Sequence, residues 1–381
     1  MSQEKIKILV TGGAGFIGSA FVKEYADDYS ICVVDKLTYA GNIASIKEEI
    51  DLGKIRFEKA DICDADAMAY ILGDFKPHYI INFAAESHVD RSVDNPKPFV
   101  DTNIAGTQNL LECARRYAAG SDFKRFVQIS TDEVYGDLPI GEERKIAGDF
   151  LGRKMPVTLY GPDGFTEETP LHPSSPYSAS KASADFMAMA YHRTYGLPVV
   201  ITRCSNNYGP RQFPEKLIPL MLNNILEGRE LPVYGNGSNV RDWIHVSDHC
   251  RGIMAAATEG QDGYVYNFGS YNEVPNLGLV KVLIYLTHCI IKDNDKYAEL
   301  RNLLPSVNNS LIKFVGDRPG HDRRYAIDSS RAMQELGWRP RVPLAQGLRD
   351  TIEWYLDNRS WTEEIVNGEY RSYYTKMYSG R

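Results

Sequence analysis

A tyrosine and a lysine are spaced along the sequence so that together they could act as a base. Tyr177 and Lys181 stand four positions apart, so a helix would place them one turn apart on the same face. A phenol has a reference pKa of about 10, which is too high for a base at neutral pH. A neighbouring ammonium group stabilises the phenolate and brings that pKa down. The pair is therefore expected to remove a proton from an alcohol, although the spacing alone is common by chance.

A hydroxyl and two carboxyls stand together at Thr131, Asp132 and Glu133, directly after the apolar run Phe126–Ser130. If that run is a strand of a parallel sheet, these groups lie at its carboxyl edge, where open α/β folds bind ligands. The hydroxyl can orient a substrate alcohol. The carboxyls can act as acid and base if their environments separate their pKa values. The alternative is a turn at a strand end with solvated carboxylates.

A glycine-rich turn follows the first apolar run, with Gly12, Gly15 and Gly18 in the segment TGGAGFIG. Glycine allows a tight turn and lets backbone N–H groups approach a pyrophosphate at the start of the next helix. The positive nicotinamide ring of such a dinucleotide would also favour a tyrosine phenolate. The alternative is a tight turn without a ligand.

Asp35 ends the second apolar run. A carboxylate there accepts hydrogen bonds from the ribose hydroxyls of adenosine and repels a 2′-phosphate, which favours NAD over NADP. A capping role before Lys36 is compatible with the same geometry. Asp61 and Ile62 close a third run, which lies between the runs Ile31–Asp35 and His78–Ala84. The sequence leaves open whether these two residues flank the adenine.

A doubly wound sheet is expected to position these groups. Strands are expected at the short apolar runs Ile6–Val10, Ile31–Asp35, His78–Ala84, Phe126–Ser130 and Pro198–Thr202. These runs are too continuous for half-exposed strands, so both faces should be buried in a parallel sheet. Helical stretches such as Asn103–Tyr117 alternate with them. The fold class is therefore α/β, a Rossmann-type parallel sheet with right-handed crossovers and a smaller C-terminal domain.

The helix that carries the Tyr–Lys pair is expected to begin with Ser175 as N-cap and Pro176 in its first turn, and to end at Gly196. Residues 344–356 predict a late helix. Residues 137–174 keep no period and predict an insertion or a mobile loop over the site.

Composition narrows the function class. The 381 residues carry 43 Lys and Arg against 50 Asp and Glu, a net charge of −7, which argues against nucleic-acid binding. No apolar run is long enough to span a membrane. The six cysteines are scattered and read as reduced core thiols of a cytoplasmic enzyme. His245 and His249 lack partners at ligand spacing, so no metal is expected.

Larger segments carry a resemblance to a known family. They are TGGAGFIGSA, VVDKLTYAGN, AAESHVDRS, ISTDEVYG, SPYSASKA, SNNYGPRQFPEKLIPL, LPVYGNGSNVRDW and DRPGHDRRYAID. With them the chain resembles the extended short-chain dehydrogenases, and among these the dTDP-glucose 4,6-dehydratases, from Lys7 to about Tyr378. The Thr-Asp-Glu triplet separates these dehydratases from related epimerases and decarboxylases.

The resemblance implies two sets of binding residues. NAD would be held by Gly12, Gly15, Phe16, Ile17, Gly18, Asp35, Lys36, Leu37, Thr38, Asp61, Ile62, Phe83, Ala84, Ala85, Ser87, Thr102, Tyr177, Lys181 and Asn207. The sugar nucleotide would be held by Ser87, Thr131, Asn206, Lys216, Leu217, Pro232, Val233, Tyr234, Arg241, Asn276, Asp317, Arg318, Pro319, Gly320 and His321. The cations of this second set suit a diphosphate.

The resemblance also implies a reaction, in which dTDP-glucose loses water to give dTDP-4-keto-6-deoxyglucose. Tyr177, with Thr131 and Lys181 beside it, would take the 4-OH proton while hydride leaves C4 for NAD. Glu133 would remove the C5 proton and Asp132 would protonate the departing 6-OH, after which hydride returns to C6.

Assembly and domain boundaries are implied in the same way. A homodimer would form through the helices near Asn103–Tyr117 and Ala182–Tyr195. An NAD-binding domain would comprise residues 1–203 plus about 239–273, and a sugar-nucleotide domain about 204–238 and 274–381.

Two stretches depart from the family pattern. The connection between Glu133 and Tyr177 and the segment Ile284–Phe314 look long, and both are expected to decorate the surface. Because the second lies between two substrate segments, a dehydratase for a UDP-, CDP- or GDP-sugar, or an epimerase, stays open. A catalytically inactive dinucleotide sensor is the rival from another class, which the intact Thr131, Tyr177 and Lys181 oppose.

Overall fold

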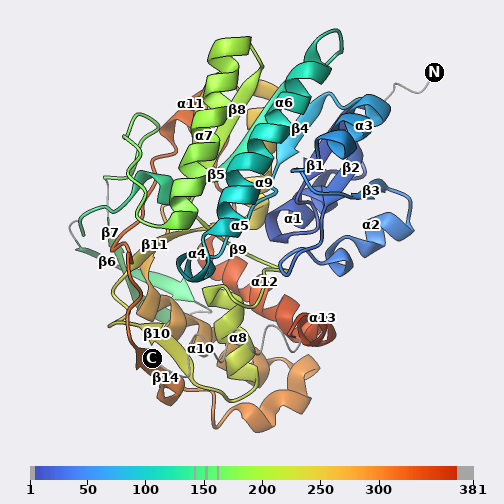
Figure 1. The fold of residues 1–381 in the computed structure, drawn as a ribbon. Helices are drawn as coiled ribbons and strands as arrows, with labels where there is room; N and C mark the ends of the chain where they lie inside the picture. The colour runs from blue at the N-terminus through green and yellow to red at the C-terminus, as the bar shows by residue number, and fades with distance from the viewer. Residues whose placement is uncertain (1–4, 141–142, 151–152, 161–162, 367–381) are drawn as a thin grey trace.

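A seven-stranded parallel sheet forms the central layer of one lobe of the protein (Figure 1). The computed structural model describes residues 5–140, 143–150, 153–160 and 163–366. The strands lie in the order β12-β8-β5-β4-β1-β2-β3. Their bounds are β1 (Lys7–Thr11), β2 (Ser30–Asp35), β3 (Ile55–Lys59), β4 (Tyr79–Asn82), β5 (Arg125–Thr131), β8 (Val199–Cys204) and β12 (Val265–Phe268). The predicted Rossmann-type parallel sheet is confirmed, although β3 and β12 were not among the strands whose ranges were predicted.

Helices cover both faces of this sheet because successive side chains of each strand point to opposite faces. On β1, Ile8 and Val10 pack in one buried cluster with residues of two helices, whereas Leu9 packs in another. The first face is covered by α1 (Phe16–Tyr25) and α9 (Val246–Glu259). The second is covered by α3 (Ala65–Phe75), α6 (Thr107–Ala118) and α7 (Pro176–Tyr195). Burial on both faces explains the continuous apolar runs of the sequence.

The strand order reverses between β1 and β4. From β1 the chain proceeds to β2 and β3 on one side, and β4, β5, β8 and β12 follow on the other. Connecting chains leave the carboxyl ends of β1 and β4 in opposite directions, which opens a crevice there. The order of strands therefore fixes where a ligand can bind.

The helix α7 begins and ends as its sequence predicts. Ser175 is the N-cap, and it exchanges hydrogen bonds with Ser178 in a capping box. Gly196 ends the helix in a left-handed conformation with φ of 70°. The late helix α12 (Leu344–Asp357) also matches its prediction.

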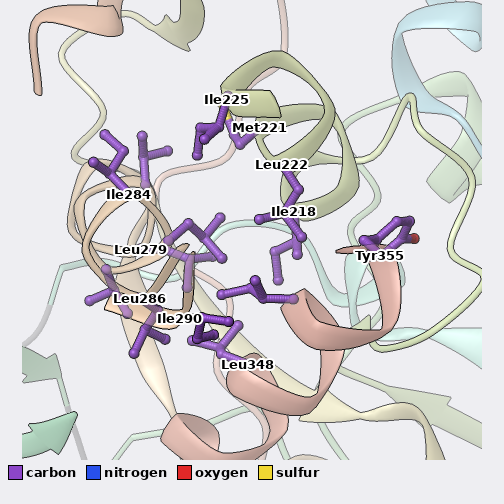
Figure 2. Packing of buried hydrophobic residues seen from close by; sticks show 14 of the residues in the cluster. Ile218, Met221, Leu222, Ile225, Leu279, Ile284, Leu286, Ile290, Leu348 and Tyr355 are labelled. Atoms are coloured by element: carbon purple, nitrogen blue, oxygen red, sulfur yellow. The ribbon is translucent and has the colours of Figure 1, made fainter. Parts of the chain in front are cut away.

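Three helices build the core of a second lobe (Figure 2). They are α8 (Leu217–Leu226), α10 (Asn276–Asp293) and α12. Beside them lie two small sheets, a parallel pair of β10 (Leu231–Tyr234) and β14 (Ile312–Val315), and a three-stranded sheet of β9 (Asn206–Tyr208), β11 (Val240–His245) and β13 (Glu273–Pro275). The shorter helices are α2 (Lys47–Asp51), α4 (Val89–Asp94), α5 (Lys97–Phe99), α11 (Ser330–Glu335) and α13 (Arg359–Ile365). The predicted domain boundaries stay a prediction.

The segment Ile284–Phe314 is not a surface decoration, and that expectation is wrong. Ile284, Leu286 and Ile290 extend the apolar face of α10 into the core of the second lobe, as Figure 2 shows. Tyr297 and Leu300 of the following 3₁₀ turns are buried in the same cluster. The segment is long because it completes this core.

The expectation of an irregular insertion over 137–174 is also wrong in part. Residues Glu143–Phe150 and Arg153–Tyr160 pair as antiparallel strands β6 and β7. The alternation of Met155, Val157 and Leu159 with polar residues is the sequence signal that was overlooked. A proline inside β7 is tolerated because this sheet has only two strands, each with a free edge.

No helix of the described residues is long and apolar enough to cross a membrane. The six cysteines carry no disulfide. The expectation of core thiols fails at Cys63, which is exposed.

A buried ion pair holds the segment after β14 against β13. Arg324 donates to Glu273 of β13 through Nε at 2.7 Å and through a second nitrogen at 3.2 Å. Both side chains are almost completely buried, at 1% and 7% exposure. Removing one partner of such a pair leaves an uncompensated charge in the interior.

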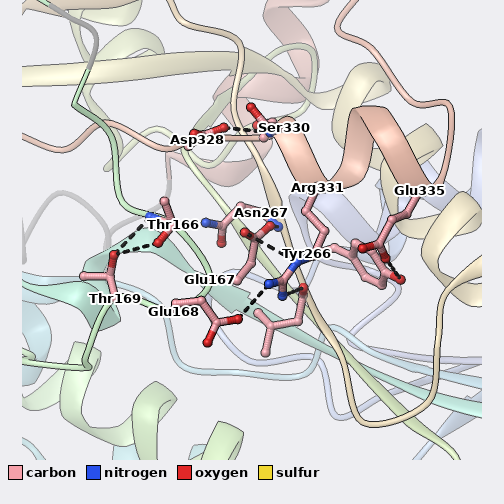
Figure 3. A network of polar contacts seen from close by, with 12 residues as sticks. Thr166, Glu167, Glu168, Thr169, Tyr266, Asn267, Asp328, Ser330, Arg331 and Glu335 are labelled. Carbon is pink, nitrogen blue, oxygen red and sulfur yellow. Dashed lines mark hydrogen bonds and ion pairs between the residues drawn. The ribbon is translucent and has the colours of Figure 1, made fainter.

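We therefore predict that Glu273→Gln lowers the free energy of unfolding by about 3 kcal/mol, measured by urea denaturation. The matched control is Glu168→Gln, because Glu168 also pairs with an arginine, Arg331, at 2.7 Å but is 82% exposed (Figure 3). Exposed pairs contribute roughly 1 kcal/mol or less. Equal losses in the two variants would contradict the argument.

Candidate active site

The glycine-rich turn between β1 and α1 is shaped for close approach by a ligand. Gly12 has φ of 68°, and a Cβ there would lie 2.6 Å from the backbone nitrogen of Ala84. A Cβ on Gly18 would collide with the carbonyl oxygen of Gly12. Within the described part of the chain, no side chain caps the N-terminus of α1. Its first N–H groups can therefore meet a pyrophosphate.

Asp35 closes the far side of this turn. One carboxylate oxygen accepts the N–H of Ala14 at 3.0 Å, and the other accepts the N–H of Leu37 at 2.8 Å. Burial raises the pKa of Asp35, and these two N–H donors oppose that shift. Each carboxylate oxygen keeps a further lone pair for a ribose hydroxyl.

A cleft runs along this edge of the sheet, and the glycine-rich turn forms part of its lining. Of the predicted NAD residues, every one except Leu37 lines it. The side chain of Leu37 packs against the sheet cluster instead, and its φ is 58°. The cleft also includes Thr131, Asp132 and Glu133. The structure thus brings the nucleotide turn and the acid–base residues into one cavity.

Tyr177 and Lys181 lie side by side on α7, buried at the inner end of the cleft. Lys181 donates from Nζ to the carbonyl oxygen of Ile129 at 2.6 Å. The ring of Phe99 packs edge-on against Tyr177, and Ser92 accepts the backbone N–H of Tyr177 at 3.2 Å. These contacts hold the phenol against the end of β5.

The pKa of Tyr177 is raised well above 10, chiefly by burial and then by Glu133, Cys204 and Asp132. The protein alone therefore does not bring the phenol into the range expected from the sequence. That expectation also counted the positive charge of a nicotinamide ring, which the bound cofactor would contribute. The Thr131 hydroxyl lowers the pKa by hydrogen bonding.

The neighbouring carboxyls of Asp132 and Glu133 have different surroundings. Burial raises the pKa of Asp132 well above its usual range, Glu133 and Asp242 raise it further, and Arg241 and the Thr131 hydroxyl oppose the shift only in part. Its Oδ2 lacks a hydrogen-bond partner among the described residues. Burial also raises the pKa of Glu133, but the cations Arg318, Lys216 and Arg241 oppose that shift. Asp132 is thus suited to hold a proton and Glu133 to accept one.

A second cavity continues from the first toward the other lobe, and Asn206, Glu133 and Lys216 line both. Of the predicted sugar-nucleotide residues, those lining this second cavity are Asn206, Lys216, Leu217, Pro232, Val233, Tyr234, Arg241, Asn276, Arg318 and His321. Ser87 and Thr131 line the first cavity.

Three predicted residues line neither cavity, and these are Asp317, Pro319 and Gly320. Asp317 accepts a hydrogen bond from His321 Nδ1 at 2.6 Å, so it positions a residue that does line the cleft. Gly320, with φ of 64°, turns the chain between them.

Polar atoms in the second cavity lack partners within the described part of the chain. They are Asn206 Oδ1, Trp243 Nε1, Asn276 Oδ1 and Arg318 Nε. A buried polar group without a hydrogen bond costs about 1–3 kcal/mol, so these atoms are available to a polar ligand.

Sequence reasoning missed several residues that line the cleft. Glu215 accepts Arg91 Nε at 2.9 Å, and Tyr325 stacks under the guanidinium of Arg241 at 4.1 Å. Both lie in segments that carry the family resemblance, Glu215 in FPEKL and Tyr325 in DRRYAID, but residue type alone gave them no role.

A π-helical turn was also missed, because no sequence rule predicts its position. It spans Val100–Gly106 and leads into α6. It directs Thr102 to Lys36 Nζ at 3.0 Å and Asn103 to the hydroxyl of Ser180 at 2.8 Å. Such turns are frequent at functional sites.

Asn207 lines the cofactor cleft, but its side chain is engaged within the protein. Its amide donates to the carbonyl oxygen of Ser205 at 3.0 Å, and its Oδ1 contacts His249 Nδ1 at 2.9 Å. Burial lowers the pKa of His249 to about 3, so this histidine is neutral and holds the amide. Among the described residues, no group of three or more His, Cys, Asp or Glu could hold a metal ion.

Comparisons with known proteins agree with this geometry. A model of the NAD dependent epimerase/dehydratase family matches residues 8–269. The dTDP-glucose 4,6-dehydratase of Shigella flexneri is 48% identical, over 99% of this chain and 100% of that protein.

Solved structures give the same grouping. DesIV, a dTDP-glucose 4,6-dehydratase from Streptomyces venezuelae solved with NAD bound, is 42% identical, with a TM-score of 0.80 over 94% of this chain and 100% of that one. A UDP-glucose 4-epimerase from Thermotoga maritima is 28% identical, with a TM-score of 0.75 over 93% of this chain and 100% of that one. The chain therefore belongs to the NAD dependent epimerase/dehydratase family, and within it to the dTDP-glucose 4,6-dehydratases.

Proposed function

We propose that this protein converts dTDP-glucose to dTDP-4-keto-6-deoxyglucose and water. The observation that carries the proposal is the pair Asp132 and Glu133, which lie in the cleft that also contains Tyr177. Burial raises the pKa of both carboxyls, and the cations Arg318 and Lys216 oppose that shift at Glu133. Oxidation of an alcohol needs one base, whereas elimination of water also needs a second base and an acid. The relatives named above are dTDP-glucose 4,6-dehydratases, which supports the same reaction.

Tyr177, Glu133 and Asp132 each transfer one proton in the reaction. The Tyr177 oxygen takes the proton of the 4-OH, while Thr131 orients that hydroxyl. Glu133 then removes the C5 proton, which the C4 ketone makes acidic, and Asp132 protonates the 6-OH as it leaves as water. Bound NAD, which the glycine turn and Asp35 would hold, accepts the hydride of C4 and returns it to C6.

Cations in the second cavity bind the diphosphate of the substrate. Lys216, Arg241 and Arg318 all line this cavity, and burial lowers the pKa of Lys216 and of Arg241. A diphosphate would restore the charge balance of these buried cations. The same cations favour the ionised form of Glu133, so substrate binding and the base are electrostatically linked.

The nucleobase is assigned to thymine on the relatives named above. Ile284–Phe314, which left the base open on sequence grounds, contributes no lining residue to either cavity. A panel of dTDP-, UDP-, CDP- and GDP-glucose, followed by mass spectrometry for loss of one water, tests the assignment. Dehydration of another sugar nucleotide in preference to dTDP-glucose would contradict it.

The two halves of the reaction should separate in variants. Tyr177→Phe should abolish oxidation, whereas Glu133→Gln should keep oxidation and slow product formation by ~10²–10⁴-fold, because the C5 proton loses its base. Enzyme-bound NADH, measured by absorbance after adding dTDP-glucose, should accumulate in Glu133→Gln and not in Tyr177→Phe.

Asp132→Asn is the matched comparison, since it also neutralises one carboxyl of the pair. It should slow departure of the 6-OH but allow exchange of the C5 proton with deuterium oxide, which Glu133→Gln should not. A Glu133→Gln enzyme that forms product at the wild-type rate would refute the assigned role.

Asp35 should select NAD. Asp35→Ala should weaken NAD binding and so reduce the preference of the protein for NAD over NADP. The variant should still bind NADP weakly, because the adjacent cation Lys36 is already engaged by Thr102 and Asp61. Dissociation constants for both cofactors, measured on cofactor-stripped protein by calorimetry, check this. Wild-type protein that binds NADP as tightly as NAD would contradict it.

The homodimer implied by the family would use α6 and α7. Phe186 and Tyr195 of α7 are 62% and 56% exposed, which suits a contact with a second copy. Phe186→Asp should halve the mass measured by light scattering, whereas Tyr70→Asp, at an exposed site on α3, should leave it unchanged. A monomeric wild type would refute the assembly.

The proposed place of action is the cytoplasm. Cell fractionation with detection of the protein tests this, and recovery in the membrane or the medium would contradict it.

A further inference from the structure

A buried carboxylate lies one turn beyond Lys181 on α7. Asp185 is 1% exposed, and its Oδ2 accepts hydrogen bonds from Ser130 Oγ at 3.0 Å and from Arg203 Nε at 2.9 Å. Its other oxygen, Oδ1, has no hydrogen-bond partner among the described residues. The reaction proposed above assigns no step to this group.

The same carboxylate is joined to the turn that carries the acid–base pair. Arg203 donates from its NH1 to the hydroxyl of Tyr135 at 2.9 Å, and its guanidinium lies 4.8 Å from the centre of that ring. Tyr135 donates in turn to Asn267 at 2.8 Å. Tyr135 is the last residue of the 3₁₀ turn Asp132–Tyr135. Its hydrogen bonds to Arg203 and Asn267 therefore hold the end of the turn that carries the acid–base pair.

Lys181 needs a compensating charge because it is fully buried. Its Nζ donates to a backbone carbonyl, which carries only a partial charge. Burial lowers the pKa of Lys181, and Asp185 is the first group that raises it. Tyr177 lies on the same helix. Cys204 and Arg203 of β8 are the ionisable groups from a neighbouring element that act on Lys181 and on Asp185, and Asp132 and Glu133, on the turn after β5, act on Tyr177.

We infer that Asp185 is a positioning residue for the oxidation step, in that its carboxylate keeps Lys181 protonated so that the ammonium can stabilise the Tyr177 phenolate. Arg203 has the opposite effect, since it neutralises part of the Asp185 charge while it anchors that carboxylate. The inference rests on the proposed function, because the oxidation is the step that it explains.

Three variants disturb the network with different changes of charge. Asp185→Asn removes the anion, Arg203→Gln removes the cation of the same ion pair, and Tyr135→Phe removes a hydrogen bond without changing charge. The holoenzyme is given dTDP-xylose, which has no C6 and therefore stops after oxidation at C4. The rate of NADH formation is then followed against pH.

The rate should fall at alkaline pH as Lys181 loses its proton. Without Asp185 the ammonium is less stable and its pKa is lower, so in Asp185→Asn this fall should move down by roughly 1–2 pH units. In Arg203→Gln the unneutralised Asp185 should move the fall upward, and in Tyr135→Phe it should stay in place. A purely structural role would lower the rate in all three variants without this pattern.

A downward shift in Asp185→Asn, with an upward shift in Arg203→Gln and no shift in Tyr135→Phe, supports the inference, and any other pattern overturns it. If Asp185→Asn does not fold, the test is Arg203→Gln, where an upward shift supports the inference and no shift overturns it. Failure of the proposed function is separate, because wild-type enzyme would then form no NADH with dTDP-xylose or no product with dTDP-glucose.

Discussion

Removal of water from the acid–base residues is the constraint on which the site depends. Asp132, Tyr177 and Lys181 are all nearly inaccessible, and for each of them burial is the largest influence on the pKa. Burial favours the uncharged form of a carboxyl, and a nearby cation favours its charged form. Two adjacent carboxyls can therefore differ in protonation, which they would not do on a wet surface.

The fold provides that constraint through ordinary elements. The reversal of strand order beside β1 opens the crevice, and β5 ends with Thr131 at its edge. The capped start of α7 fixes the Tyr177 and Lys181 pair against β5. The second lobe adds Lys216, Arg241 and Arg318, whose charges act on Glu133 but are not among the main influences on the pKa of the phenol. The separation of acid from base thus needs both lobes.

Much of this arrangement follows from local sequence. The caps Ser175 and Gly196 and the apolar runs predict α7 and most of the parallel sheet, because each is decided by neighbouring residues. The predicted cofactor residues line the cleft, apart from Leu37, whose backbone rather than side chain faces Asp35. Their roles stay predictions.

What the sequence did not predict depends on contacts between distant segments. The core role of Ile284–Phe314 appears only when α10 packs against α8 and α12. The raised pKa of Tyr177 reflects burial by several elements, which spacing on one helix cannot show. The link from Asp185 to Arg203 and Tyr135 joins three segments, and none of these residues is unusual in its own stretch of sequence.

The most direct test of the central claim follows the hydrogen atoms of the substrate. If one closed site performs oxidation, elimination and reduction in turn, dTDP-glucose deuterated at C4 should give product with the deuterium at C6. In deuterium oxide, unlabelled substrate should acquire solvent deuterium at C5, and catalytic amounts of NAD should suffice. Release of NADH in proportion to substrate, or a C4 label that never reaches C6, would contradict the account.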